Sequence, residues 1–335
     1  MLGEFIEQLR NRQDLDEAAA EQALERVLQP ETPDEEIRAF LIALADKGET
    51  PEEIAGFARG MRRMAVRVRS RHEYFVDTAG TGGGRPTFNI STTAAFVIAG
   101  AGVPVAKHGN RAATSRCGSA DVLEALGIPT RRPAEVSQQA LDEIGICFLF
   151  APTHHPSMQR VAQIRRELGR RTIFNLLGPL TNPAGAPCQL IGVFAPELTE
   201  KLGKVLQRLG TRRSWVVHSR DGFDELSTAA GNRVAEVGNG DFQLFEFQRM
   251  PVSDVPPVGG TPEENAALLA GILAGEIQGG ALGVVLLNAA AAVHLATGMT
   301  FSEAYREAEA SVNDGKAERK LNQLREFYLD TEGIS

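Results

Sequence analysis

The sequence has 335 residues, of which 43% are hydrophobic and 23% are charged, and its formal net charge is -8. These values are ordinary for a globular protein, and the length allows one large α/β unit or two domains. The negative charge gives no general electrostatic support to a protein that coats nucleic acid. Cys117, Cys147 and Cys188 lack the spacing of a zinc site or a disulfide framework. We expect them to be reduced thiols of a cytoplasmic protein.

The N-terminal part of the chain predicts helices. In Thr32-Pro33-Asp34-Glu35, Thr32 suits an N-cap, Pro33 the first helical position and Glu35 a capping box. Thr50-Pro51-Glu52-Glu53 repeats this pattern, and apolar residues at helical spacing follow both. Residues 1–68 are therefore expected to form a small helical domain.

From Tyr74 onward, short apolar runs alternate with helical segments, which predicts a larger α/β domain over residues 72–335. Its central sheet is expected to be mixed, mostly parallel and flanked by helices. Strands are predicted at Tyr74–Asp77, Val103–Ala106, Cys147–Phe150, Gln189–Phe194, Ser214–His218 and Arg233–Val237. Helices are predicted at Thr92–Gly100, Ala120–Leu126, Ala134–Ile144 and Leu198–Leu209.

One later segment is apolar enough to raise the question of a membrane span. Residues 281–299 carry no formal charge, and their length approaches the roughly 20 residues that a spanning helix needs. Alanine dominates this segment, however, and Asn288, His294 and Thr297 interrupt it. A buried helix of a globular core is therefore expected, without a membrane partner.

The densest glycine run follows the first predicted strand. The stretch "DTAGTGGGRPTFNIST" at 77–92 places glycines between a strand and a helix, where backbone N–H groups and a helix N-terminus can bind phosphate. It fits neither the dinucleotide fingerprint, which needs glycine at Arg85, nor a Walker A loop. A strained turn without a ligand is the alternative that the glycines alone leave open.

Two further polar loops follow predicted strands and make a phosphate site more plausible than a bare turn. Lys107-His108-Gly109-Asn110-Arg111 follows one strand, and Gly118-Ser119 then opens another helix. Asp224-Glu225 follows a later strand and offers the oxygen ligands that Mg²⁺ prefers beside phosphates. Each loop alone is more often a solvated surface; together they indicate a ligand with several phosphates.

Seven blocks in the same order make the sequence resemble the anthranilate phosphoribosyltransferase family. Individually they are short, but together they extend over most of residues 75–300. They lie at 80–83 (GTGG), 87–92 (TFNIST), 105–127, 148–158, 165–185, 216–227 and 285–298. The resemblance implies transfer of phosphoribose from phosphoribosyl diphosphate to the amine of anthranilate, with release of diphosphate, in tryptophan biosynthesis. It also implies a homodimer formed through the helical domain, which helices within about 154–180 would complete.

The resemblance implies roles for individual residues. Metal ligands for two Mg²⁺ ions arriving with the diphosphate would be Ser91, Asp224 and Glu225. Anthranilate would contact Gly80, Asn110, Arg165 and Gly178, with Arg165 pairing with its carboxylate. Phosphoribosyl diphosphate would contact Gly80, Gly82, Gly83, Thr87, Asn89, Ile90, Ser91, Thr92, Lys107, His108, Gly109, Asn110, Arg111, Ala112, Ala113, Thr114, Ser115 and Ser119.

The chemistry that the resemblance implies needs no strong base, because an aryl amine is already neutral near pH 7. Negative charge builds on the leaving diphosphate, where Mg²⁺, Lys107 and backbone N–H groups would stabilise it. His108 could accept a proton late in the reaction or be a structural member of its loop. His154 and His155 are expected to line a hinge or the cleft wall, and Trp215 to lie in the core.

The glycine loop departs from the family pattern, which usually reads Gly-Thr-Gly-Gly-Asp-Gly, two residues and Thr. Here Gly84-Arg85-Pro86 precedes Thr87, so the loop is one residue shorter and its aspartate is missing. A cation, Arg85, replaces the lost carboxylate, which would ease binding of a free polyanion and reduce the effect of additional Mg²⁺. Cys117 stands where a small Ser or Ala is more usual.

Two other functions compete with this one. A pyrimidine-nucleoside phosphorylase would share the fold and a glycine loop, but the blocks at 107–111 and 165–183 favour the transferase. A non-catalytic homologue that binds nucleic acid is disfavoured by the net charge of -8 and the retained Asp224-Glu225 pair. Phosphorolysis of thymidine, or salt-sensitive DNA binding without transfer, would distinguish them.

Overall fold

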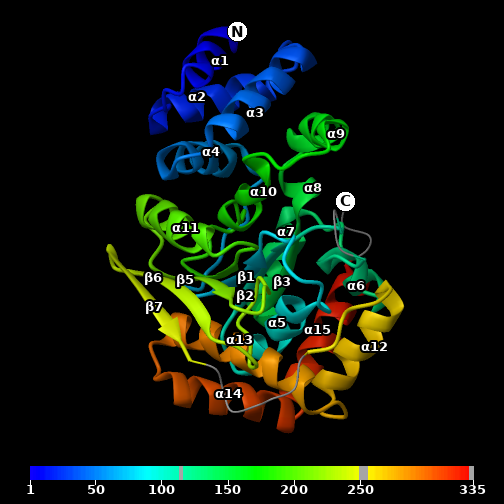
Figure 1. Ribbon diagram of the computed structural model, residues 1–335. Coiled ribbons are helices and arrows are strands. Elements are labelled where there is room, and N and C mark those ends of the chain that lie inside the picture. The colour runs from blue at the N-terminus through cyan, green and yellow to red at the C-terminus, as the bar shows by residue number, and fades with distance from the viewer. Residues whose placement is uncertain (113–115, 249–255, 332–335) are drawn as a thin grey trace.

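The computed structural model describes residues 1–112, 116–248 and 256–331, which form a helical part and a larger α/β part (Figure 1). Four helices begin the chain: α1 (Gly3–Arg10), α2 (Glu17–Leu28), α3 (Asp34–Lys47) and α4 (Pro51–Met64). Apolar side chains from all four helices are buried in one cluster, which includes Leu9, Leu24, Phe40 and Phe57. The expected helical N-terminal domain is confirmed.

A seven-stranded sheet forms the centre of the α/β part, in the order β3-β2-β1-β4-β5-β6-β7. Strands β1 to β5 are parallel, and β6 and β7 extend the sheet in antiparallel fashion. The expected mixed, mostly parallel sheet is therefore confirmed. The strands are β1 (Val76–Gly80), β2 (Val105–Gly109), β3 (Ile146–Phe150), β4 (Cys188–Gly192), β5 (Arg213–Ser219), β6 (Asn232–Gly238) and β7 (Asp241–Phe247).

Helices cover both faces of this sheet. One hydrophobic cluster joins the sheet to helices of the C-terminal half and to α5, whereas the second joins the other face to α11 and the helical part. Figure 1 shows α11 above the sheet and α13 and α14 below it. These helices are α5 (Ile90–Gly100), α6 (Ser119–Ala125), α7 (Ala134–Ile144), α11 (Glu197–Arg208), α12 (Pro262–Leu273), α13 (Gly280–Thr297), α14 (Phe301–Asn313) and α15 (Lys316–Asp330).

The chain returns to the helical part between β3 and β4. This excursion contains α8 (Ala151–His154), α9 (Met158–Leu168), α10 (Phe174–Leu177) and the 3-10 turn η1 (Gly178–Leu180). Helix α9 contacts α2 and α3, and α10 contacts α4. Val161, Ile164 and Phe174 accordingly share the hydrophobic cluster of the first four helices.

Two local predictions were wrong. Thr32 does not cap α3, because Pro33 is the N-cap and the Thr32 hydroxyl instead donates to the Arg26 carbonyl oxygen at 2.5 Å. Strand β7 was not predicted from the sequence. Its half-buried aromatic residues alternate with exposed ones, and none of its residues is fully buried. By contrast, Thr50 forms the predicted capping box with Glu53, and Pro51 occupies the first helical position.

The apolar segment at 281–299 forms α13, a core helix. It is long and apolar enough to cross a membrane, but most of it is buried within the protein. It packs against α5, α14 and strands β1, β4 and β5. The expected buried helix is confirmed, and Trp215 is likewise buried in the core.

Candidate functional site

The candidate site lies where the order of the parallel strands reverses. Successive strands β1, β2 and β3 extend the sheet in one direction, whereas β4 and β5 extend it in the other. Ligands of open α/β sheets bind at such a switch point, outside the carboxyl ends of the strands. Gly80 and Gly192 are paired at the ends of β1 and β4, so the glycine loop begins at this point.

The glycine loop packs directly on the carboxylate of Asp224. A Cβ atom at Gly80 would lie 3.0 Å from Asp224 Oδ2, and one at Gly84 would lie 2.9 Å from Oδ1. At Gly192 an added Cβ would overlap the Asp224 carbonyl oxygen, at 1.6 Å. Gly82 and Gly83 instead adopt φ angles of +65° and +83°, which favour glycine. The glycine density thus has two causes, close approach of a carboxylate and left-handed backbone.

Hydrogen bonds hold the glycine loop between the end of β4 and the loop that follows β5. The Thr81 backbone N–H donates to the Gly192 carbonyl oxygen at 2.9 Å, and the Thr81 hydroxyl accepts from the Phe194 N–H at 3.1 Å. On its other side, the Arg85 N–H donates to the Gly222 carbonyl oxygen at 2.8 Å, while the Arg85 guanidinium lies 5.1 Å from the Phe223 ring centroid. The cation that departs from the family pattern therefore packs on the Asp224 loop.

Glu225 lies at the N-terminus of α5, beside Ser91 and Lys107. Its carboxylate accepts a hydrogen bond from the Ser91 backbone N–H. Lys107 is buried, and its Nζ donates to the Thr78 carbonyl oxygen at 2.6 Å and to Ser91 Oγ at 3.3 Å. Burial, followed by repulsion from Asp224, raises the pKa of Glu225 to about 8 despite the nearby Lys107. Burial also raises the pKa of Asp224.

Asp77 is a buried charge of this site that the sequence reasoning missed. Its Oδ1 accepts from the His108 backbone N–H at 3.1 Å, which holds the start of the loop after β2. Oδ2 has no hydrogen-bond partner among the described residues. Burial raises the pKa of Asp77 to about 6, while Lys107 acts in the opposite direction. Burial lowers the pKa of Lys107, and Asp77 and Glu225 oppose this change.

The His108 side chain points from β2 toward η1. Its Nδ1 lies 3.1 Å from the Gly178 carbonyl oxygen, and its ring centroid is 5.4 Å from that of His155. Burial, together with His155 and His154, lowers the pKa of His108 to about 3. The imidazole is therefore neutral near pH 7, and Nδ1 carries the proton that it donates to Gly178. So weak a base favours the structural role over proton transfer.

His154 and His155 join the segments that connect the two parts of the chain. The Val66 N–H donates to the His154 carbonyl oxygen at 2.9 Å, and His154 Nδ1 lies 2.9 Å from the Val66 carbonyl oxygen. His155 Nε2 lies 3.0 Å from the Thr181 carbonyl oxygen. These bonds place both histidines at the junction, where a hinge or cleft wall was expected.

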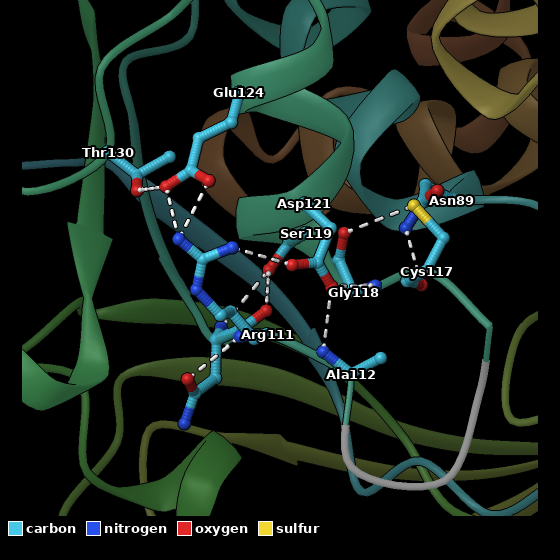
Figure 2. A network of polar contacts seen from close by, with 10 residues as sticks. Asn89, Arg111, Ala112, Cys117, Gly118, Ser119, Asp121, Glu124 and Thr130 are labelled. Carbon is cyan, nitrogen blue, oxygen red and sulfur yellow. Dashed lines mark hydrogen bonds and ion pairs between the residues drawn. The ribbon is translucent and has the colours of Figure 1, made fainter. Parts of the chain in front are cut away.

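The loop after β2 is organised by its own acidic residues (Figure 2). Arg111 donates to Asp121 at 2.9 Å and to Glu124 at 2.7 Å and 2.8 Å. Asp121 also accepts from the Ala112 and Gly118 backbone N–H groups, both at 2.9 Å. Although burial opposes it, these bonds lower the pKa of Asp121. The N-terminus of α6, expected to bind an anion, thus already holds a carboxylate, and the Arg111 guanidinium is paired.

Ser119 and Asn110 lie together at the edge of this network. The Asn110 N–H donates to Ser119 Oγ at 3.2 Å, and Ser119 Oγ also lies 3.2 Å from the Asn110 carbonyl oxygen. A Cβ at Gly109 would meet Ser119 Oγ at 2.1 Å, so this glycine permits the close approach. The Asn110 side-chain oxygen accepts from the Arg111 N–H at 2.8 Å, which leaves its amide group exposed.

The remaining residues expected at phosphoribosyl diphosphate differ in exposure. Thr87 is half-buried, whereas the side chains of Ile90 and Thr92 are buried and can offer only backbone groups. Asn89 ties the start of α5 to Cys117 and Asn265 through its side-chain amide. The expected contacts at Ala113, Thr114 and Ser115 lie outside the described residues.

The residues expected to bind anthranilate come from separate segments. Arg165 lies on α9 with its guanidinium 5.6 Å from the Phe174 ring centroid, and burial lowers its pKa. Within the described ranges, no carboxylate pairs with Arg165. Gly178 follows α10 and is exposed, and it contacts the loop of Asn110 through His108. A half-buried, unpaired guanidinium suits a carboxylate ligand.

The donor set fits Mg²⁺ bound together with phosphate, rather than a metal held by protein alone. The described residues contain no group of three or more His, Cys, Asp or Glu side chains that could hold a metal ion. Asp224, Glu225 and the Ser91 hydroxyl supply hard oxygen donors, and burial raises the pKa values of both carboxyl groups. Mg²⁺ commonly uses one or two carboxylates, waters and substrate phosphates.

Comparison with known proteins gives the same answer over the full chain. The family model for the helical bundle domain of a glycosyl transferase family matches residues 3–65, and the model for its a/b domain matches residues 72–318. Anthranilate phosphoribosyltransferase from Moorella thermoacetica is 49% identical over 334 residues, covering 97% of both chains. The Symbiobacterium thermophilum enzyme is 50% identical over 330 residues, covering 96% of both.

Solved structures agree with the sequence comparisons. The crystal structure of anthranilate phosphoribosyltransferase from Thermus thermophilus has a TM-score of 0.89 and 41% identity, covering 97% of this chain and 99% of that one. The Saccharomyces cerevisiae enzyme, solved in complex with PRPP and Mg, has a TM-score of 0.87 and 27% identity over 98% of both chains. The phosphorylase and nucleic-acid alternatives are not favoured by these relatives. The chain belongs to the anthranilate phosphoribosyltransferase family.

Proposed function

We propose that the protein transfers the phosphoribosyl group of phosphoribosyl diphosphate to the amine of anthranilate and releases diphosphate. The observation that carries this proposal is the convergence of three strand-end loops at the switch point of the sheet. These loops contribute the glycines at 80–84, the buried Lys107 and the Asp224-Glu225 pair. Relatives that carry this name match nearly the whole chain.

The described residues support the departure of diphosphate from the sugar. Lys107, the Ser91 end of α5 and the backbone N–H groups of the glycine loop bring positive electrostatic potential to one place. Charge that develops on the leaving group is stabilised most by donors that are already oriented. The aryl amine is neutral near pH 7, so the neutral, weakly basic His108 need not remove a proton from it first. Holding the amine close to the sugar supplies the proximity contribution.

Asp224, Glu225 and Ser91 would hold Mg²⁺ in this proposal, with two ions arriving on the diphosphate. Mg²⁺ would neutralise charge on the diphosphate when bound. Support comes from the position of Asp224 against the glycine loop and of Glu225 at the Ser91 end of α5, and from the yeast relative that was solved with PRPP and Mg. Arg165 would pair with the anthranilate carboxylate, which its half-buried and unpaired guanidinium supports. A yeast relative solved with 4-fluoroanthranilate supports binding of anthranilate itself.

The test is the loss of anthranilate fluorescence in the presence of phosphoribosyl diphosphate while Mg²⁺ is titrated. Wild-type protein should consume anthranilate only with Mg²⁺. Asp224→Asn and Glu225→Gln should raise the Mg²⁺ concentration needed for half-maximal rate by about tenfold or more. Glu246→Gln, which alters an exposed β7 carboxylate that pairs with Arg220, is the control and should behave as wild type. No consumption at any Mg²⁺ concentration would overturn the proposal.

We further propose that residues 1–68 and the helices within about 154–180 form one domain, and residues 72–335 the other. The shared hydrophobic cluster and the ion pairs of Arg160 with Asp34 and Arg170 with Asp46 support this division.

The chain would dimerise through the helical domain. Light scattering coupled to size-exclusion chromatography would show a mass near twice 36.1 kDa.

We propose the cytoplasm as its location. Cys117, Cys147 and Cys188 are all buried, and none of these three described residues forms a disulfide. Reduced, buried thiols are typical of proteins in that compartment.

A further inference from the structure

Arg171 contacts the glycine loop of the α/β part from a segment that packs with the helical part. It lies in the short connection between α9 and α10, the segment that packs with the helical part. Its guanidinium carbon is 3.7 Å from the centroid of the Phe194 ring, which follows β4 at the switch point. This short distance places the flat guanidinium group on the aromatic face, where a cation is attracted to the ring.

The same guanidinium contacts the backbone of the glycine loop. Arg171 Nη2 donates to the Gly83 carbonyl oxygen at 3.4 Å, a long hydrogen bond. A Cβ atom at Gly83 would lie 3.0 Å from this nitrogen, so any other residue there would crowd the guanidinium. The positive φ angle of Gly83 favours glycine, and the absence of a side chain there leaves room for the guanidinium.

Most donors of Arg171 remain available. A guanidinium has five N–H donors, and the structure engages one of them with Gly83. No carboxylate pairs with Arg171 within the described ranges, although its neighbour Arg170 pairs with Asp46 at 2.7 Å. Arg171 is also exposed, so an incoming anion can reach it. An unpaired planar cation with a fixed orientation is suited to bind phosphate oxygens through two parallel hydrogen bonds.

We propose that Arg171 is a diphosphate-binding residue, which contributes to the site from the segment between α9 and α10. This inference rests on the proposed function, since it takes the glycine loop to hold diphosphate. Phe194 fixes the plane of the guanidinium, and Gly83 fixes one of its edges, which leaves the other donors directed to an anion at the loop. The leaving group would then be bound by residues from both parts of the molecule.

The test measures binding of inorganic diphosphate with Mg²⁺ by calorimetry, which requires no transfer to anthranilate. Arg171→Ala should weaken diphosphate binding about tenfold, as expected for loss of one charge-assisted contact. Arg171→Lys should weaken diphosphate binding less than Arg171→Ala does, because lysine keeps the positive charge but lacks the planar guanidinium group. Phe194→Leu, which removes the aromatic face but keeps an apolar side chain, should weaken binding less than Arg171→Ala.

Arg170→Ala is the matched control, since it removes an adjacent exposed cation that Asp46 already neutralises. It should bind diphosphate within about twofold of wild type. The inference would be wrong if Arg171→Ala bound diphosphate as wild type does, or if Arg170→Ala weakened binding equally. Melting temperatures of all variants verify folding, and the lysine variant remains informative if the alanine variant is unstable. Diphosphate binding without anthranilate consumption would contradict the proposed function but leave this inference standing.

Discussion

At the scale of single residues, the site depends on buried ionisable groups that interact with one another. Asp77 and Lys107 lie on adjacent strands and are both buried, and Glu225 lies near the same lysine. The charge of Asp77 or of Lys107 would be costly alone, because transfer from water penalises the ionised form. Their mutual attraction keeps a cation under the glycine loop, where a polyanionic ligand is proposed to bind.

Asp77→Asn should change the pH dependence of stability. Burial raises the pKa of Asp77 to about 6 from 3.8, so its ionisation costs stability as pH rises from 3.8 through 6. The variant lacks this cost, and its free energy of unfolding relative to wild type should rise over that range by up to about 3 kcal/mol. Urea unfolding of both proteins at pH 4 and pH 7 measures the difference in their free energies of unfolding. We expect this difference to be larger at pH 7 than at pH 4.

Activity of the same variant should fall nevertheless, because a neutral amide at this position would no longer balance the charge of Lys107. The amide oxygen can still accept from the His108 N–H, so the backbone of the loop should be retained. We expect a larger rise in the KM for phosphoribosyl diphosphate than in that for anthranilate. Equal changes in the two KM values would argue against this role of Asp77.

Arg165→Ala should weaken the use of anthranilate specifically. Removing one charge-assisted, partly buried contact should raise the KM for anthranilate about 10- to 100-fold and leave that for phosphoribosyl diphosphate within about threefold. Arg166→Ala is the control, since its side chain is exposed on the same helix. Steady-state kinetics with each substrate varied in turn gives both constants. Comparable increases for both substrates would refute the proposed pairing.

Single residues were only partly predictable from the sequence. The glycines and the Asp224-Glu225 pair were recognisable only in combination, because several polar loops that follow predicted strands together indicate a phosphate ligand. Asp77 escaped notice because a carboxylate in a strand acquires its role only through pairing of β1 with β2. Arg111 was expected at phosphate, but it pairs with Asp121 and Glu124, which lie one turn apart on α6 and outside its own segment.

At the scale of elements, the start of α4 is a connected group of buried polar bonds. Glu53 is fully buried and accepts from the Leu15 and Thr50 backbone N–H groups at 2.9 Å and 2.8 Å. It also accepts from Lys47 Nζ at 2.9 Å. One carboxylate thus joins α4 to the loop before α2 and to the end of α3.

Glu53→Ala should therefore destabilise the protein strongly, by about 3 to 5 kcal/mol, because it leaves two buried backbone donors without an acceptor and removes one of the two carboxylates that pair with Lys47, which retains Asp14. Glu52→Ala removes only a partly exposed pair with Arg208 and should cost less than about 1 kcal/mol. Urea unfolding monitored by circular dichroism compares the two variants. Similar losses in both would contradict the assignment of Glu53 as the centre of this group.

Elements were more predictable than their ends. Six strands and the helix at Ala134–Ile144 follow from apolar periodicity, since buried faces constrain it directly. Strand β7 gave a weak signal because it forms the outer edge of the sheet and is largely exposed. The Thr32 cap was wrong because a hydroxyl near a helix start can also bond to the preceding turn, as it does with Arg26.

At the scale of the whole molecule, strand order determines which loops form the site. The sequence alone does not state that β1 lies between β2 and β4, and this order brings Gly80, Gly192 and Asp224 together. The return of the chain through α8 to η1 similarly places Arg171 over Phe194. Resemblance implied the site residues, whereas contacts such as these depend on the folded arrangement and had to be observed.

The central claim, that these converging loops transfer phosphoribose to anthranilate, is tested most directly by reaction stoichiometry. Anthranilate consumed and diphosphate released are measured together with phosphoribosyl diphosphate and Mg²⁺, and thymidine with phosphate is assayed in parallel. We expect one diphosphate released per anthranilate consumed and no cleavage of thymidine. Phosphorolysis of thymidine without consumption of anthranilate would contradict it.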